Sequence, residues 1–408
     1  ASNAHSHAFH RVLRGRTHAG GGSFWTWREQ MYEAAGALTP QLYEQLATAV
    51  FAEMVVSGFS SVAEFHYVHH RPDGSAYGGE DPGEHAMELA LARAAVAAGI
   101  RLTLLDTCYL AGGFGVPLNN RQQRFGDRDA QAWLDRLASL RKAIAAEFDP
   151  AQVSVGAALH SVRGVPEAAL QVVAAGLPAD LPLHIHLSEQ PAENVACLAA
   201  TGLTPTMLLH KHGLLTRRLS AVHATHLNSE DIAALGEAGA TVVMCPTTEA
   251  DLADGIGPAA WLQTAGARIA LGTDQHAVVD PFLEMRALEH GERLSSGERG
   301  RFTPADLLAA ASDAGSLALG RTRAGLEIGA VCDLMSVDPA SIRTAGSRPG
   351  QLALTATAAD VHTVVVGGRI RARNGRHATL GDPALLLAFA IAAVDAARTT
   401  APEGAPRP

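Results

Sequence analysis

Short runs rich in apolar and β-branched residues recur along this 408-residue chain, with helix-like stretches between them. Alternating strands and helices are typical of parallel βαβ units, and eight such units predict an α/β fold, a closed (β/α)8 barrel of the TIM type. A doubly wound open sheet is the alternative, because it is assembled from the same units. The helical stretches include Ala86–Ala98, Asp129–Glu147 and Asp231–Ala238. The predicted strands are Ala4–His7, Ser61–Tyr67, Arg101–Cys108, Val153–His160, Leu181–Leu187, Ser220–His226, Thr241–Cys245 and Ile269–Asp274.

The chain is longer than a barrel of about 250 residues requires. We expect the barrel over residues 1–325 and a small β module over residues 326–380, which contains the strand-like runs Val331–Val337 and Val361–Ile370. Residues 381–408 are predicted to form a C-terminal helix and a flexible tail, because the sequence from Thr399 onward is rich in Pro, Gly and Ala.

Composition narrows the class of protein. The net charge of −9 argues against nucleic acid and anionic membranes as partners. No apolar run reaches 18 residues, so we expect no membrane-spanning helix. The four cysteines are widely spaced, which favours reduced thiols in the cytoplasm over a disulfide framework.

Polar residues lie close to the C-terminal ends of five predicted strands. These residues are His7, His160, His186, His223 and Asp274. Active sites of such barrels lie at that end of the strands, so we expect the five side chains to converge. His5 and His7 face the same side of an extended strand and could bind one metal ion together.

Four motifs in this order resemble the amidohydrolase superfamily, whose members are metal-dependent hydrolases and deaminases built on (β/α)8 barrels. The motifs are His5-Ser6-His7, His184–Glu189, His223–His226 and Gly272–His276. The resemblance implies one divalent ion, with zinc expected, held by His5, His7, His186 and Asp274. The late strands resemble the superfamily's small β-sandwich, whose other strands normally come from the N-terminus. We therefore expect this sequence to be incomplete at its N-terminal end.

A narrower resemblance is to the formimidoylglutamate deiminase family. It is carried by His5–Arg11, Ser23–Glu29, Glu64–His70 and His160–Arg163. The resemblance implies hydrolysis of N-formimidoyl-L-glutamate to N-formyl-L-glutamate and ammonia, as in histidine degradation. One position departs from the family, which usually carries glutamine where His10 stands.

The resemblance also implies roles for three catalytic residues. Glu189 is the expected proton shuttle, because ammonia leaves readily only when its nitrogen is protonated. His223 is expected to stabilise the attacked carbon's substituents or the attacking hydroxide, and Asp274 to accept a proton from water. A small dicarboxylate substrate would be held by arginine forks and hydroxyls. The residues expected in that role are His10, Arg28, Tyr67, His160 and Arg163.

Two alternatives keep part of this interpretation. A barrel aminohydrolase of another substrate, such as a heterocycle or a guanidino acid, would use the same metal site but favour aromatic stacking. A non-catalytic metal-binding protein would have no need of Glu189.

We also expect His66, His69 and His70 to form a solvated loop over the pocket, with a second metal site as the alternative. A homodimer is expected from the resemblance.

Overall fold

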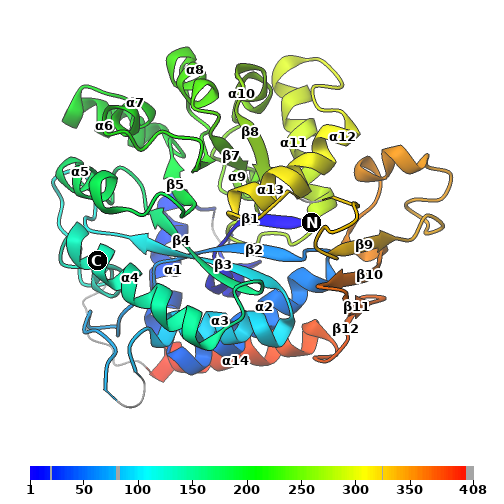
Figure 1. Ribbon diagram of the computed structural model, residues 1–408, viewed down its shortest axis with the longest axis horizontal. Helices are drawn as coiled ribbons and strands as arrows, with labels where there is room; N and C mark the ends of the chain where they lie inside the picture. Colours follow the sequence, from blue (N-terminus) through cyan, green and yellow to red (C-terminus); the bar gives the residue numbers. More distant parts are fainter. Residues whose placement is uncertain (19–20, 80–82, 324, 401–408) are drawn as a thin grey trace.

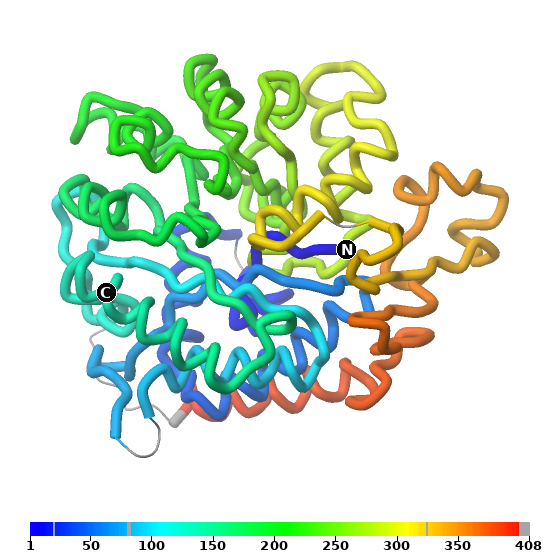
Figure 2. Tube along the Cα trace, viewed as in Figure 1, coloured from blue at the N-terminus to red at the C-terminus, as the bar shows by residue number. Residues whose placement is uncertain are grey.

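The computed structural model describes residues 1–18, 21–79, 83–323 and 325–400. In this part of the chain, eight parallel strands pair in sequence order, and helices surround them (Figures 1 and 2). The predicted barrel is therefore confirmed over the open-sheet alternative. The strands are β1 (Ser2–Ser6), β2 (Ser61–His66), β3 (Arg101–Cys108), β4 (Val153–Leu159), β5 (Leu183–Leu187), β6 (Leu219–His223), β7 (Thr241–Met244) and β8 (Arg268–Leu271).

Local sequence signals fix where several helices begin. The Thr39 hydroxyl accepts a hydrogen bond from the Leu42 amide, and Pro40 follows it as the first residue of its helix. Asp129 caps its helix by accepting from the Ala132 amide at 2.8 Å. The helices are α1 (Phe24–Ala37), α2 (Pro40–Val56), α3 (Ala86–Ala98), α4 (Ala130–Glu147), α5 (Glu167–Gly176), α6 (Pro191–Thr201), α7 (Pro205–Lys211), α8 (Ser229–Glu237), α9 (Pro246–Asp251), α10 (Ala259–Ala265), α11 (Pro281–Ser296), α12 (Pro304–Ala309), α13 (Gly315–Ala318) and α14 (Pro383–Thr400). Shorter helical turns are η1 (Ala8–Leu13), η2 (Gln123–Phe125), η3 (Ala310–Ala314), η4 (Pro349–Leu354) and η5 (Ala358–Asp360).

The barrel closes where β1 meets the residues that follow β8. Ser6 and Asp274 form a single parallel bridge. The His5 carbonyl accepts hydrogen bonds from the amides of Thr273 and Asp274, both at 3.0 Å, and the His7 amide donates to the Asp274 carbonyl at 3.1 Å. This seam therefore brings the first strand directly beside a residue that we predicted to belong to the site.

Strand β1 is polar and yet fully buried. Such a strand is tolerated only when its polar groups find partners. The Asn3 side chain donates to Thr273 Oγ1 at 2.7 Å and accepts from the Thr273 amide at 3.0 Å. Ser2 pairs with the hydroxyl of Ser316 at 3.0 Å. These hydrogen bonds hold β1 in one register against residues that follow β8 in the chain.

Two strands end three residues earlier than the sequence patterns predicted, whereas β1, β2, β4 and β7 end one residue earlier. The sixth ends at His223 instead of His226, and the eighth at Leu271 instead of Asp274. The backbone explains both differences, because φ is +67° at His223, +50° at Ala224 and +39° at Asp274. These residues have left the extended conformation, so their side chains turn toward the barrel axis instead of alternating across a strand.

A second sheet lies beside the barrel, at the right of Figure 1. It contains β9 (Leu334–Val337), β10 (Val361–Val366), β11 (Arg369–Arg373) and β12 (Arg376–His377), which pair antiparallel. Helix α14 then returns to pack against α2. No helix among the described residues is long and apolar enough to span a bilayer. Residues 401–408, where we expected a flexible tail, lie outside the described residues.

Candidate active site

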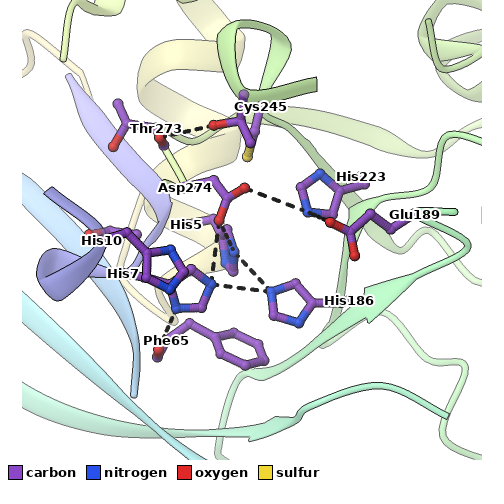
Figure 3. Close-up of polar contacts among 12 residues, drawn as sticks. His5, His7, His10, Phe65, His186, Glu189, His223, Cys245, Thr273 and Asp274 are labelled. Carbon is purple, nitrogen blue, oxygen red and sulfur yellow. Dashed lines mark hydrogen bonds and ion pairs between the residues drawn. The ribbon is translucent and has the colours of Figure 1, made fainter. Parts of the chain in front are cut away.

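The four predicted metal ligands meet at one end of the barrel (Figure 3). Nε2 of His186 lies 3.2 Å from Nε2 of His5 and 3.3 Å from Nε2 of His7. Oδ1 of Asp274 lies 3.3 Å from Nε2 of His5 and 3.4 Å from Nε2 of His7. The structure thus brings together side chains from β1, from the turn after it, from β5 and from the loop after β8.

Backbone carbonyls orient two of these imidazoles. Nδ1 of His7 donates to the Phe65 carbonyl, and Nδ1 of His186 donates to the His160 carbonyl, both at 2.8 Å. Since a carbonyl can only accept, the Nε2 atom of each neutral ring carries a lone pair directed into the cluster. Burial lowers the pKa of His5, His7 and His186, which keeps them in the neutral form that binds metal. Buried, converging acceptor atoms of this kind fit a divalent cation.

Glu189 and His223 lie next to this cluster. Nε2 of His223 is 3.8 Å from Oε1 of Glu189 and 3.8 Å from Oδ2 of Asp274. Glu189 follows β5, and His223 is the last residue of β6. All three side chains are at least nine-tenths buried. The predicted catalytic residues therefore lie close enough to act on one small group.

The surroundings of His223, Glu189 and Asp274 shift the pKa values of these three residues in different directions. Burial lowers the pKa of His223, but its hydrogen bond to Glu249 and the charges of Glu189 and Asp274 outweigh this and raise the pKa to about 10. Burial raises the pKa of Glu189, although His223 and Arg163 oppose that shift. Burial also raises the pKa of Asp274, but contact with His5 and His223 prevails and lowers it to about 2. An ionised carboxylate and a more readily protonated one thus face each other across the site.

A narrow pocket of about 50 Å³ opens onto the cluster. Nε2 of His10 contacts the Tyr67 hydroxyl at 3.0 Å. The Arg163 guanidinium lies 3.9 Å from the Glu189 carboxylate. All five residues predicted to bind substrate line this pocket, namely His10, Arg28, Tyr67, His160 and Arg163.

The sequence of the chain matches the amidohydrolase family over residues 2–371. The chain belongs to the amidohydrolase family. The predicted enzyme class, a hydrolase of C–N bonds, is thereby confirmed. Membership also fits the cluster of histidines and aspartate, since enzymes of this family are typically metal-dependent.

Three relatives of this amidohydrolase are informative. The formimidoylglutamate deiminase of Pseudomonas aeruginosa is 38% identical over 92% of this chain and 84% of its own length. This similarity confirms the narrower resemblance found in the sequence. The crystal structure of an amidohydrolase from Brucella melitensis superposes with a TM-score of 0.86 and 33% identity, covering 97% of this chain and 88% of the other. An adenosine deaminase from Xanthomonas campestris with bound zinc gives a TM-score of 0.82 at 25% identity, over 98% and 85% of the two chains.

Several pocket residues of this amidohydrolase were not predicted. Phe24 and Trp27 line the pocket from α1, within the Ser23–Glu29 motif that we used only as a family marker. Met31, one turn further along the same helix, and Leu252 also line it. The helical spacing of Phe24, Trp27 and Met31 is a signal that could have identified this face.

A hydrogen-bond network behind Arg28 was also missed. Arg28 Nε donates to the Tyr32 hydroxyl at 2.6 Å. The Gln122 amide donates to the hydroxyls of Tyr32 at 3.1 Å and Tyr109 at 2.9 Å. The network therefore holds the guanidinium of Arg28 through residues that do not themselves line the pocket. Nothing in the sequence near Gln122 marks it as part of the site.

The predicted solvated histidine loop is wrong for two of its three members. His66 and His69 are buried, with 1% and 3% of their surfaces exposed. Nδ1 of His69 lies 2.7 Å from the Glu88 carboxylate, and Nε2 of His66 lies 3.3 Å from it. The guanidinium of Arg136 reaches the same place and donates to His69 Nδ1 at 3.1 Å. His66 and His69 are not solvated because α3, which carries Glu88, and α4, which carries Arg136, cover them. The guanidinium of Arg136 is the positive charge beside this cluster of two histidines and Glu88.

Proposed function

We propose that this amidohydrolase converts N-formimidoyl-L-glutamate and water to N-formyl-L-glutamate and ammonia. The observation that carries the proposal is the position of Glu189 next to both His223 and Arg163, with Arg28 on the same pocket. Such a site offers a proton donor to the leaving nitrogen and two guanidinium groups to the carboxylates of a glutamate moiety. The similarity to the Pseudomonas aeruginosa deiminase supports the same substrate.

One zinc ion is the proposed cofactor, held by His5, His7, His186 and Asp274. When bound, a divalent ion lowers the pKa of water at the site to near neutrality. Three imidazoles and one carboxylate are a donor set that zinc accepts readily. The zinc bound to the related Xanthomonas campestris deaminase supports this choice.

The proposed reaction divides proton transfer between two carboxylates. Asp274, whose lowered pKa keeps it ionised, accepts a proton from the water that attacks the formimidoyl carbon. The His223 imidazolium, favoured by its raised pKa, stabilises the tetrahedral intermediate. Glu189 protonates the departing nitrogen as the C–N bond breaks, and its raised pKa suits this role. The nitrogen enters as part of a protonated formimidoyl group, so the proton from Glu189 completes ammonia. The hydroxyl proton of the intermediate returns to Glu189 as the formyl carbonyl forms, and Asp274 passes its proton to the departing ammonia.

The glutamate end of the substrate is assigned to the outer pocket. Arg28, Tyr67 and Arg163 would bind its carboxylates, and His160 and His10 would complete the wall. His10 stands where the deiminase family usually has glutamine, and its ring contacts the Tyr67 hydroxyl. A ring nitrogen can accept or donate a hydrogen bond as an amide does, so the substitution is compatible with the same substrate.

Three further expectations belong to this proposal. Residues 1–325 would form the catalytic unit, residues 326–380 the β module, and residues 381–408 the C-terminal helix and tail. The enzyme would act in the cytoplasm, which the buried free thiols of Cys108, Cys197 and Cys245 support. It would assemble as a homodimer, which light scattering of the purified protein tests.

An ammonia-release assay tests the substrate directly. The metal-loaded protein is expected to turn over N-formimidoyl-L-glutamate much faster than guanidino acids or purine and pterin heterocycles. Two arginines on the pocket favour a dianion over a neutral heterocycle. Faster turnover of a heterocycle would replace the proposed substrate while leaving the amidohydrolase chemistry in place.

Removal of the metal is expected to abolish ammonia release. The neutral imidazoles of the cluster cannot by themselves activate water, so chelated and dialysed protein should be inactive. Adding Zn²⁺, Mn²⁺ or Fe²⁺ separately should restore activity to different extents, with zinc restoring the most at one ion per chain. Full activity in protein shown by elemental analysis to be metal-free would contradict the proposed cofactor.

Substitution of Arg163 by lysine is expected to raise KM for N-formimidoyl-L-glutamate by about 10- to 150-fold. A hydrogen bond to a charged group contributes about 1.5–3 kcal/mol, and lysine cannot form the paired bonds of a guanidinium. kcat should change far less, because Arg163 binds the substrate end that does not react. A substrate analogue that lacks one carboxylate shows which arginine binds that carboxylate. If Arg163 binds it, the analogue should bind equally weakly to wild type and to Arg163→Lys; if Arg28 binds it, the same should hold for wild type and Arg28→Lys.

A further inference from the structure

Glu249 is a buried carboxylate in contact with His223 that the proposed reaction does not use. We propose that Glu249 is a positioning residue, which holds the His223 imidazole in the orientation required for the reaction. This inference rests on the proposed function. The contacts of Glu249 are with His223 and the Cys245 amide, and not with the residues predicted to bind substrate or metal.

The contact is direct and confined. Oε1 of Glu249 lies 3.3 Å from Nδ1 of His223 and accepts a second hydrogen bond from the Cys245 amide at 2.8 Å. Glu249 has 4% of its surface exposed. Because the carboxylate accepts from Nδ1–H, the opposite ring nitrogen, Nε2, is directed toward Glu189 and Asp274. Figure 3 shows His223 directed toward these two carboxylates.

His223 depends on this bond for its orientation. On the Nε2 side, both carboxylates are 3.8 Å away, which is too far for a hydrogen bond. Among the described residues, the Glu249 contact is the only side-chain hydrogen bond of His223. The backbone at His223 has φ of +67°, a conformation that costs free energy and persists only where the surroundings enforce it. The ring also stacks on His186, with centroids 5.8 Å apart, but that contact does not determine which ring nitrogen faces Glu189 and Asp274.

The helix that carries Glu249 is itself fixed to the barrel. Helix α9 begins directly after β7, and Glu249 lies in its first turn. Thr248 donates to the Thr273 carbonyl at 3.3 Å, next to Asp274. Thr247 donates through its amide, at 3.1 Å, and its hydroxyl, at 2.5 Å, to the buried carboxylate of Glu284 on α11. Glu249 can therefore act as a rigid support, and Glu284, a buried glutamate on α11 that contacts α9 but not His223, provides a matched control.

The test compares Glu249→Leu with Glu249→Gln and Glu284→Leu in the metal-loaded, full-length enzyme. Glu249→Leu is expected to lower kcat for N-formimidoyl-L-glutamate by about 10- to 100-fold, the usual effect of losing an orienting partner. KM and metal content should stay within about twofold, since neither the pocket arginines nor the metal ligands are touched. Glu249→Gln keeps an oxygen that can accept from Nδ1–H and should recover most of the lost kcat. Glu284→Leu removes a buried carboxylate that does not touch His223, while the bond from Thr248 to the Thr273 carbonyl still holds α9 in place, so kcat should stay near that of wild type.

A double substitution decides between positioning and general damage. In a His223→Ala background, Glu249→Leu should cause no further loss of kcat, because the ring that Glu249 holds is gone. An equal loss in both backgrounds, or an equal loss in Glu284→Leu, would overturn the inference. Wild-type kcat in a folded Glu249→Leu would also overturn it. If Glu249→Leu fails to fold, Glu249→Asp, whose shorter side chain withdraws the carboxylate from Nδ1 of His223, carries the same comparison against His223→Ala. A wild-type enzyme without turnover would reject the proposed function instead.

Discussion

Replacing Glu189 by glutamine is expected to lower kcat for N-formimidoyl-L-glutamate by about 10²- to 10⁴-fold, the usual contribution of general acid–base catalysis. An amide of the same shape cannot deliver a proton to the leaving nitrogen. KM and metal content should change little, because the substitution keeps the volume of a side chain that lies 3.9 Å from Arg163 and is not one of the four proposed ligands. Steady-state ammonia release with elemental analysis measures all three quantities.

A matched control separates lost chemistry from the general cost of neutralising a buried carboxylate. Glu292 is similarly buried, but its carboxylate accepts from the Ala260 amide, and it does not line the active-site pocket. Glu292→Gln should therefore retain wild-type kcat. A Glu189→Gln enzyme that is as active as Glu292→Gln would remove Glu189 from the mechanism.

Asp274→Asn is the substitution with the broadest expected effect. Asp274 contacts His5 and His7 through Oδ1 and faces His223 through Oδ2. An amide at this position removes the negative charge that strengthens binding of a divalent ion and the base that accepts a proton from water. We expect loss of bound metal on dialysis together with a fall in kcat of about 10²- to 10⁴-fold from the missing proton acceptor alone.

Excess zinc distinguishes the two parts of that effect. Saturating Zn²⁺ should refill the site of Asp274→Asn but leave kcat low, because the proton acceptor is still missing. In a His186→Ala variant, excess zinc should restore more activity, since Asp274 is retained. Full recovery of Asp274→Asn on adding zinc would show that the residue serves only as a ligand.

Much of the fold could be predicted because each barrel strand carries its own signal. Arg101–Cys108 is a short run rich in leucine and β-branched threonine, and it forms β3 over the predicted residues. The site could be located because barrel strands all end at one rim, so His186 and Asp274 had to approach each other wherever the helices lay. This reasoning uses topology alone and needs no side-chain packing.

The remainder depended on tertiary contacts that leave no local pattern. Glu249 is one glutamate among many in the sequence, and its importance follows only from the approach of α9 to the end of β6. His66 and His69 resemble solvated histidines until Arg136, from a helix about 70 residues later, covers them. The ends of β6 and β8 were predicted three residues too late, because the periodicity of a sequence does not report a change of φ.

The barrel seam also determines when this enzyme can first become active. Asn3 and Thr273 are joined by a buried hydrogen bond although 270 residues separate them. Contacts between such distant segments form late, because the whole intervening loop must be closed first. During synthesis β1 therefore leaves the ribosome long before its partner exists, and its polar residues stay solvated until β8 emerges. Assembly of the active site therefore waits for β8 and Asp274, and a nascent chain that ends before them lacks one proposed metal ligand and one side of the seam.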